Sequence, residues 1–464
     1  MVWAEPLKAK NIRRVTVMLS KKAKGLGLTL ASAILLAACG GSSSPDTASK
    51  SSTSNKDGES NEVVTITFWD ENAGPERTPI WQEIINRFEE ENENIKVEYF
   101  GLPKDEAKSK IDAAIAAKDV PDVASIQTSW LPEYSIREAF LPLDDYFADS
   151  ELNGKINQGT IDFNKKIVND GKLYGVPYTQ NLDVIWIRPD LFAEAGIEAP
   201  KTWDDFFSSV DTMTTDDMYG YTIRGGAGGS LQLQRLMYAY SGITEYVTED
   251  GKATVNDPAH KEFLEKYFAL YLNNTPQSDI TNGYKEMVAT FDTGKAAMVH
   301  HNIGSFGEHS KALEADQFEA IPLPVTVDGG NYVAEGGNTI GVSIFAETEH
   351  PEEAFKFLEF VNNAESQSNW NRLIGQIPTN SDVMAEDWIQ DAQHLSVAFS
   401  VYDDENTALY EPPFYLPDYR SILDNQVDPA IQSVMAGDLS IDDFLSDWAE
   451  AIEASAAKYA EAFN

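Results

Sequence analysis

The residues of this chain that could do catalytic or metal chemistry do not stand in a catalytic or metal-binding pattern. Among its 464 residues are 75 Asp and Glu, so the carboxylate pair that a glycosidase needs is easy to find, but nothing selects one pair. Of the six histidines, His300 and His301 are adjacent and would point to opposite faces of a strand, and no HExxH or Cys/His zinc spacing is present. No Gly-x-Ser-x-Gly motif occurs, and the glycine-rich run 224–229 fits neither the Walker nor the Rossmann pattern. No residue pattern therefore indicates an enzyme, a cofactor or a metal site, and we expect none of the three, with a glycosidase kept as an alternative.

Cys39 is the single cysteine, and it stands at the end of an apolar run. A lone cysteine excludes an internal disulfide. The basic stretch 21–24 precedes the apolar run 26–38, which is too short to span a bilayer but suits the core of a signal peptide. The run ends in Leu-Ala-Ala-Cys-Gly at 36–40, the pattern at which a bacterial lipoprotein signal peptidase cuts before a lipid-bearing cysteine. We expect residues 1–38 to be a signal peptide and Cys39 to be lipidated.

The segments on either side of this signal carry two further expectations. Met18 stands three residues before the first lysine of the basic stretch, so we expect translation to begin at Met18. Residues 40–61 are rich in Ser, with Thr, Asn, Asp and Gly, a composition that cannot bury a core. We interpret 40–61 as a flexible tether between a lipid anchor and a folded body.

The balance of charge excludes some partners. The chain has a formal net charge of -40. Such an acidic surface repels phosphate backbones and anionic lipid headgroups, so we expect no nucleic-acid partner and a membrane contact through the lipid anchor alone. Overall charge favours a neutral or cationic ligand over an anionic one, although it says little about a single pocket. The length of the chain suits two domains with separate cores.

Hydrophobic periodicity predicts an α/β body. Residues 63–68 and 95–100 alternate like strands, and 122–126 reads as a third strand. Between them, 80–91 and 104–117 have helical spacing, which gives strand, helix, strand, helix, strand. The same reading predicts a strand at 183–187 and helices at 203–213, at 351–362 and over the last 25 residues. Because no internal repeat and no second linker is found, the two domains are expected to be interleaved.

Several short pieces from residue 63 to the C-terminus resemble a known family, the extracellular solute-binding proteins of sugar ABC importers, which are similar to maltose-binding protein. The pieces stand in family order: ITFW at 66–69, FEEEN at 88–92, IKV at 95–97, PDV at 121–123, LPLDD at 141–145, GKLYGVP at 171–177, PKTWD at 200–204, FDTGKAAM at 291–298, GGN at 336–338 and GQIP at 375–378. No single piece is diagnostic, but their order behind a lipoprotein signal makes the resemblance specific.

The resemblance implies a two-lobed, type II periplasmic-binding-protein-like fold with interleaved lobes and three hinge crossings. We place the crossings near 176–180, 318–321 and 361–366, the N-terminal lobe at 62–177 plus 321–362, and the C-terminal lobe at 181–318 plus 366–464. It also implies a monomer that captures a sugar, expected to be an oligosaccharide, by hinge closure. The protein would sit on the outer face of the cytoplasmic membrane and pass the sugar to the permease subunits of an ABC importer. A binder of another solute such as a polyamine, and a secreted glycosidase, are the alternatives.

A sugar ring has an apolar face that stacks on aromatic side chains and a rim of hydroxyls that need polar partners. Matching the family's cleft loops to this sequence implies the following ligand-binding residues: Asp70, Asn72, Gln127, Trp130, Asn181, Asp183, Arg224, Gly225, His301, Asn302, Phe306, Gly337, Asn338, Tyr419 and Arg420. Two departures stand out, since Asn181 replaces an acid of the family and Phe306 stands near the position of a stacking Trp. Trp130 lies in a loop that ought to be polar, which favours a stacking platform. Its alternative is packing against Leu131 and Tyr134.

Overall fold

The structure is a computed structural model that describes residues 63–326 and 330–463. The predicted signal peptide, the lipidated Cys39 and the tether at 40–61 lie outside the described residues. The described residues belong to one unit of the chain, Ser60–Asn464. Among them, no helix combines the length and the apolar character that a membrane span requires.

A six-stranded sheet forms the first lobe. Its strands, in spatial order, are β10 (Ile377–Pro378), β4 (Val176–Gln180), β9 (Thr339–Ile344), β3 (Val123–Gln127), β1 (Val64–Asp70) and β2 (Ile95–Gly101). β1 pairs in parallel with β2 and β3, whereas β9 is antiparallel to β3 and β4. Because parallel neighbours need a crossover, a helix follows β1 and another follows β2. The carboxyl ends of β1 and β3 therefore meet at one edge of the sheet.

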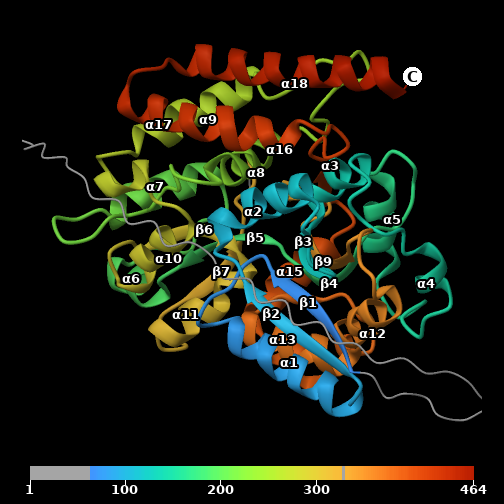
Figure 1. The fold of residues 1–464 in the computed structure, drawn as a ribbon. Coiled ribbons are helices and arrows are strands. Elements are labelled where there is room, and N and C mark those ends of the chain that lie inside the picture. Colours follow the sequence, from blue (N-terminus) through green and yellow to red (C-terminus); the bar gives the residue numbers. More distant parts are fainter. Residues whose placement is uncertain (1–62, 327–329, 464) are drawn as a thin grey trace, which may run out of the picture. The chain divides into compact units, whose positions relative to one another are not determined.

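Helices cover this sheet: α1 (Thr78–Glu91), α2 (Lys104–Ala117), α3 (Leu131–Ile136), α4 (Asp144–Ala148), α5 (Gln158–Lys166), α12 (Pro351–Asn362) and α13 (Ala364–Ile374). Figure 1 shows α1 and α13 together below the strands. Phe68 of β1 packs edge to face on Trp81 of α1 and on Phe357 of α12, with ring centroids 4.7 and 5.3 Å apart. Trp370 of α13 lies 4.7 Å from Trp81. These buried rings fix the helices on the sheet.

A three-stranded antiparallel sheet, in the order β6 (Met298–Asn302), β5 (Asp183–Ile187) and β7 (Glu319–Pro322), lies at the centre of the second lobe. A small parallel pair joins β8 (Val333–Glu335) to β11 (Ala408–Tyr410). The helices of this lobe are α6 (Pro189–Ala195), α7 (Trp203–Met213), α8 (Gly229–Ser241), α9 (Pro258–Ala269), α10 (Tyr284–Asp292), α11 (Phe306–Ala312), α14 (Asp387–Asp391), α15 (Gln393–Tyr402), α16 (Tyr419–Ile422), α17 (Asp428–Ala436) and α18 (Ile441–Phe463). Figure 1 places α18 along the side of this unit opposite α1.

The order of the strands shows where the chain passes between the sheets. It leaves the six-stranded sheet after β4, joins the three-stranded sheet at β5, and returns with β9. Strand β10 pairs with β4, so residues 377–378 also belong to the first sheet. The lobe boundaries stay a prediction. The range 366–464 that we gave to the C-terminal lobe nevertheless includes most of α13 and all of β10, which lie with the first sheet. The short helix α13 and strand β10 follow α12 directly, and both pack on β4.

Candidate functional site

A cavity of about 120 Å³ lies between the carboxyl edge of the six-stranded sheet and the second lobe. The ends of β1, β3 and β4 and the start of β9 supply one wall, and the end of β6, helix α8 and the loop before it supply the other. Ten of the residues predicted from the sequence line it: Asp70, Asn72, Gln127, Asn181, Asp183, Arg224, His301, Asn302, Gly337 and Asn338. Parts of the chain far apart in sequence therefore converge on one polar cavity.

Asp70, the last residue of β1, is buried in the first-lobe wall with only 1% of its surface exposed. Its carboxylate accepts hydrogen bonds from the Tyr99 hydroxyl at 2.8 Å and from the backbone N–H of Asn72 at 3.0 Å. Burial raises the pKa of Asp70 to about 6, because desolvation disfavours the charged form more than these two hydrogen bonds stabilise it. Asp70 therefore changes its charge close to neutral pH.

Glu71 and Lys104 form an ion pair beside Asp70. The Lys104 Nζ lies 2.5 Å from Glu71 Oε2, and the Gln127 side-chain N–H donates to the same oxygen at 3.0 Å. Lys104 begins α2, and burial lowers the pKa of its ammonium, which the charge of Glu71 opposes. The pair holds Gln127 and the carboxylate of Glu71 in fixed positions at the cavity wall.

The second-lobe wall contains a buried ion network around Asp183, the first residue of β5. Arg235 of α8 donates to Glu335 at 2.7 and 3.0 Å, and its Nε lies 3.3 Å from Asp183. His300 Nε2 lies 3.2 Å from the other carboxylate oxygen, and Asn338 donates to Asp183 at 3.1 Å. Burial alone would raise the pKa of Asp183, but Arg235 and His300 outweigh it and lower the pKa to about 2. Asp183 is therefore a permanent anion.

A chain of amides lines the cavity where the two lobes join. The Gln376 side chain donates to Asn181 Oδ1 at 2.8 Å and accepts from the Trp370 indole at 2.9 Å. The backbone N–H of Asn181 donates to the carbonyl of Asn338 at 2.9 Å. These bonds tie the segment between β4 and β5 to the start of β9 and to α13.

Three buried polar atoms of the cavity lining have no hydrogen-bond partner in the described part of the chain: Asn72 Oδ1, Gln232 Oε1 and His301 Nδ1. Gln232 is only 4% exposed, and its amide N–H is already used by the carbonyl of His300. His301 stacks on Tyr284 with centroids 4.7 Å apart, and burial lowers its pKa well below the usual value, so its ring is neutral. Buried polar atoms without partners are rare in folded proteins, and these three belong to residues that line the cavity.

Among the residues that the structure describes, no group of three or more His, Cys, Asp or Glu side chains is arranged to hold a metal ion.

A family model of the bacterial extracellular solute-binding proteins matches residues 74–368, more than half of the chain. The chain belongs to this family. Its members are binding proteins, so the prediction that the chain is not an enzyme is confirmed.

Named relatives agree with this family. The chain is 26% identical over 388 residues to a putative binding protein of Brucella abortus, covering 81% of this chain and 89% of that protein. It is 25% identical over 368 residues to the multiple sugar-binding protein of Streptococcus mutans, covering 76% and 81%. An ABC transporter solute-binding protein of Thermotoga lettingae, solved with α-D-tagatose, matches with a TM-score of 0.74 and 20% identity over 85% of this chain and all of that one. This likeness confirms the predicted two-lobed fold.

Trp130 of this solute-binding protein does not reach the cavity. It is 2% exposed and packs edge to face on Tyr134, with ring centroids 6.4 Å apart. Leu131 is buried in the same cluster. The structure therefore places Trp130 in the core, as in the packing alternative. Trp130 has buried Leu and Tyr neighbours on the same turn. The sequence alone could not distinguish such a core position from a platform for stacking a sugar.

Four other predicted residues also lie outside the cavity lining: Gly225, Phe306, Tyr419 and Arg420. Phe306 stacks on His394 with centroids 4.0 Å apart. Tyr419 is buried and donates to the Gln234 side chain at 2.8 Å. A Cβ on Gly225 would lie 2.5 Å from the Asp279 carbonyl, so this glycine permits close backbone packing.

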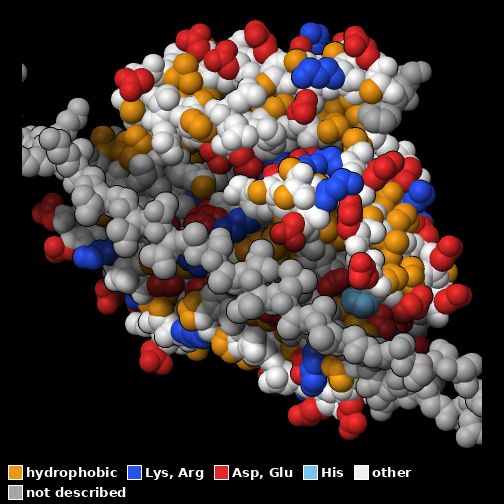
Figure 2. Space-filling model, viewed as in Figure 1, with side chains coloured by type: hydrophobic (Ala, Val, Ile, Leu, Met, Phe, Trp, Pro, Cys, Tyr) orange, Lys and Arg blue, Asp and Glu red, His pale blue; other side chains and the backbone are white. Residues whose placement is uncertain are grey.

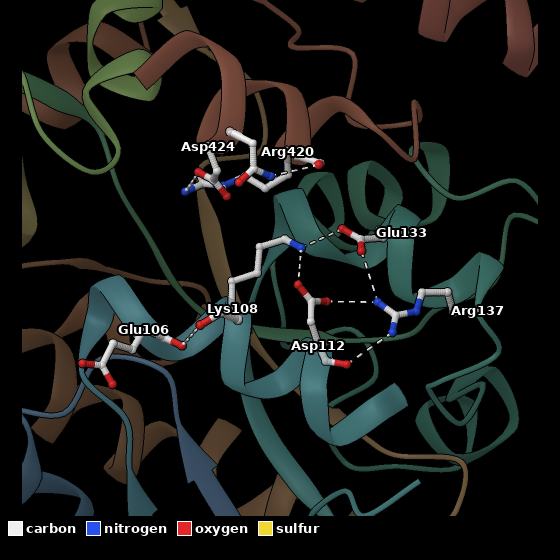
Figure 3. A network of polar contacts seen from close by, with 10 residues as sticks. Glu106, Lys108, Asp112, Glu133, Arg137, Arg420 and Asp424 are labelled. Atoms are coloured by element: carbon white, nitrogen blue, oxygen red, sulfur yellow. Dashed lines mark hydrogen bonds and ion pairs between the residues drawn. The ribbon is translucent and has the colours of Figure 1, made fainter. Parts of the chain in front are cut away.

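Arg420 pairs with Asp424 of its own helical segment at 2.8 Å. Figure 3 shows this pair facing a network on α2 and α3, with no interaction drawn between the two groups. In that network Lys108 bridges Asp112 and Glu133 at 2.9 and 2.8 Å.

The sequence prediction missed several charged and polar residues of the lining: Glu71, Arg77, Lys104, Gln232, Arg235, Tyr284, Glu335 and Gln376. One available signal was the pair Gln232 and Arg235, which stand three positions apart in α8 and so share one face. Another was Glu71, the immediate neighbour of the predicted Asp70. Lys104 opens a predicted helix, and nothing in its context distinguished it from other surface lysines.

Proposed function

We propose that this solute-binding protein captures a sugar between its two lobes and delivers it to the permease subunits of an ABC importer. The observation that carries the proposal is the cavity lined by Asn72, Gln232 and His301, because the side-chain oxygens of Asn72 and Gln232 are acceptors without a partner among the described residues and the unpartnered Nδ1 of the neutral His301 ring can donate or accept. Sugar hydroxyls both donate and accept, so they suit these acceptors and the amides and carboxylates around them. The multiple sugar-binding protein of Streptococcus mutans and the tagatose-bound protein of Thermotoga lettingae add support from relatives.

The cavity contains charges that nearly balance, unlike the chain as a whole. Acidic side chains are spread over the visible face of the described residues in Figure 2 and dominate the formal net charge of -40. The lining holds four acids and four cations: Asp70, Glu71, Asp183 and Glu335, with Arg77, Lys104, Arg224 and Arg235. Carboxylates held by cations remain good hydrogen-bond acceptors without giving the cavity a net charge. A polyamine would need free carboxylates, but Glu71, Asp183 and Glu335 are paired already.

Buried aromatic side chains also border the cavity, where a small movement of the lobes would bring them to the apolar face of a sugar ring. Tyr178, Tyr284, Trp370 and Phe414 line the cavity from both lobes. Ligand that contacts both walls would favour the closed arrangement of the lobes, since closure requires contacts that the open arrangement lacks. We retain the expectation that the ligand is an oligosaccharide and that the protein works as a monomer.

The location of the protein is part of the proposal and depends on residues outside the described ranges. We propose that Cys39 carries the lipid and that the tether at 40–61 holds the body at the outer face of the cytoplasmic membrane. Mass spectrometry of the mature N-terminal peptide tests this, because a lipidated Cys39 should be the first residue. Replacement Cys39→Ala should release the protein into the medium or leave its signal peptide uncut, and an unmodified Cys39 inside a longer mature chain would contradict the anchor.

Titration calorimetry of the purified protein against monosaccharides, disaccharides and oligosaccharides tests the ligand class. We expect at least one sugar to bind with a Kd of about 1 μM or tighter, about -8 kcal/mol. The variant Gln232→Leu should weaken that binding about tenfold, because the acceptor is lost from a desolvated site. Gln390→Leu, which changes an exposed glutamine of α14, is the matched control. Heat of binding with polyamines and none with any sugar would overturn the proposal.

A further inference from the structure

Arg224 differs from the other cations of the cavity in having no close carboxylate partner. The others have a carboxylate oxygen within 2.8 Å: Arg77 with Glu308, Lys104 with Glu71 and Arg235 with Glu335. The ion pair of Arg224 is with Asp105, at 3.9 Å, which is beyond hydrogen-bond distance. Neither Nη nitrogen of Arg224 donates a hydrogen bond to another described residue of this chain. A guanidinium in the cavity wall therefore keeps one side free.

The glycine-rich run 224–229 holds this guanidinium in place. Arg224 Nε donates to the carbonyl of Ala227 at 2.7 Å, so the side chain folds back over its own loop. A Cβ on Gly228 would lie 2.4 Å from Arg224 Nη2, and Gly228 has a φ of +76°. The positive φ favours glycine at 228, and the absence of a Cβ lets the guanidinium lie against the loop. The Asp428 carboxylate stabilises the loop by accepting hydrogen bonds from the backbone N–H groups of Gly228 and Ser230 at 2.6 and 2.8 Å.

Arg224 is desolvated and lies among charges of both signs. Burial lowers the pKa of Arg224, the carboxylates of Asp428 and Asp105 oppose this, and the positive charges of Arg420 and Arg235 add to it. Arg420 has a buried Nη1 atom without a hydrogen-bond partner among the described residues. An anion placed against Arg224 would replace lost hydration and reduce the repulsion between these cations.

We infer that the sugar bound by this protein carries a carboxylate group, as a uronic acid does, and that Arg224 binds this group through its two Nη nitrogens. This inference rests on the proposed function, because it names the class of sugar. A guanidinium with both Nη atoms free on one side matches the two oxygens of a carboxylate. Preorganisation by the glycine loop means that little side-chain freedom is lost on binding.

The charge of the lining selects a carboxylate over a phosphate. Asp70 lines the same cavity and has neutral hydrogen-bond donors in place of an ion-pair partner among the described residues, so its ionised form would repel a dianionic phosphoryl group about twice as strongly as a single negative charge. One unpaired guanidinium balances one carboxylate. The net charge of the chain, which opposes anions at long range, is screened over about 10 Å in ordinary buffer and does not cancel a contact inside the cavity.

The test compares matched sugars by calorimetry: glucuronic acid with glucose, galacturonic acid with galactose, the corresponding disaccharides, and glucose 6-phosphate. We expect a uronate to bind at least tenfold tighter than its neutral parent, and tighter than the sugar phosphate. Arg224→Gln should remove this preference, so that the uronate and its neutral parent bind this variant with affinities within threefold of each other. Arg224→Lys should restore part of it, because a lysine supplies charge but not the planar fork.

Two controls keep the outcomes separate. Arg372→Gln, which removes an exposed arginine of α13, should leave both affinities unchanged, and the melting temperature of each variant shows that it is folded. Raising the salt concentration from 50 to 500 mM should weaken uronate binding and leave neutral-sugar binding unaffected. If neutral sugars bind and no uronate exceeds its parent, or if the sugar phosphate binds tighter, this inference is wrong and the proposed function stands. If no sugar of either kind binds, the proposed function itself fails.

Discussion

The two walls of the cavity place the same residue type in opposite electrostatic states. Asp70 in the first lobe and Asp183 in the second are both buried at the end of a strand, and each accepts more than one hydrogen bond or ion-pair contact. Burial raises the pKa of Asp70 to about 6, whereas the pKa of Asp183 is lowered to about 2. The difference lies in the partners, because Asp70 contacts a neutral hydroxyl and a backbone amide, and Asp183 contacts a guanidinium.

This contrast shows which interaction decides the charge of a buried carboxylate in the cavity. Neutral donors reduce the cost of burial without removing it, whereas a cation within 3.3 Å reverses the shift. The first wall therefore contains a carboxylate that can take up a proton near neutral pH, and the second contains a permanent ion network. The three predictions below alter one wall at a time.

The largest expected effect comes from removing the cation of the second wall. Arg235→Met would leave Asp183 and Glu335 as buried charges without their common partner, which should lower the free energy of unfolding by about 3–5 kcal/mol at pH 7. Urea unfolding followed by tryptophan fluorescence measures this. The exposed Arg372→Met is the control and should change stability by less than about 0.5 kcal/mol. A loss below about 1 kcal/mol for Arg235→Met would show that the network is not what keeps Asp183 charged.

Replacing Asp70 in the first wall should change the free energy of unfolding in the opposite direction. The pKa of Asp70 is raised in the folded protein, so ionisation costs stability at pH values above 3.8, and the full cost is present above about 6. Asp70→Asn should therefore raise the free energy of unfolding at pH 7.5 by up to about 3 kcal/mol, at about 1.4 kcal/mol per pKa unit. The gain should shrink as the pH falls through 6 and nearly vanish at pH 4.

The charges around Asp70 have a smaller influence on its pKa than burial has, so the change of stability with pH can be assigned to burial. Glu71 raises its pKa and Arg77 lowers it, and both act less strongly than burial does. Asn keeps a carbonyl oxygen for the Tyr99 hydroxyl or for the Asn72 N–H, so part of the gain is offset by one lost hydrogen bond. A pH-independent difference between Asp70→Asn and the unchanged protein would mean that Asp70 titrates at an ordinary pKa.

The elements of the fold could be predicted well from hydrophobic spacing. The helices expected at 104–117, 203–213 and 351–362 and the strand at 183–187 have the same bounds in the structure as α2, α7, α12 and β5. Each of these elements buries one clear stripe or a continuous apolar run, so the local pattern and the tertiary packing agree. The short β10 was missed, because two residues carry no periodicity and the pairing with β4 is a long-range contact.

The two walls differ in how much of the site the sequence revealed. In the first wall Asp70 and Gln127 are the last residues of β1 and β3, and Asn72 follows β1, so these polar residues at strand ends could be recognised from the sequence. In the second wall Arg235 lies inside α8 and Glu335 ends a three-residue strand. Their pairing depends on how α8 packs on β5 and β8, which no local pattern contains. The roles of Trp130 and Tyr419 could not be predicted for a related reason, because an aromatic side chain suits a buried core as well as a sugar ring.

The smallest expected effect is the counterpart of the second prediction in the other wall. Because the pKa of Asp183 is lowered from 3.8 to about 2, its ionised form contributes stability that is fully present well above pH 3.8 and is lost as the pH falls through about 2. Asp183→Asn should therefore lower the free energy of unfolding by about 2 kcal/mol at pH 7, and about half of this difference should be gone at pH 3. Urea unfolding of Asp183→Asn and of Asp70→Asn across this pH range compares the stability contributions of the two carboxylates under the same Asp-to-Asn replacement. Opposite signs at pH 7 are expected because Arg235 contacts Asp183 and does not contact Asp70. Equal signs would mean that burial, and not the cation, governs both walls.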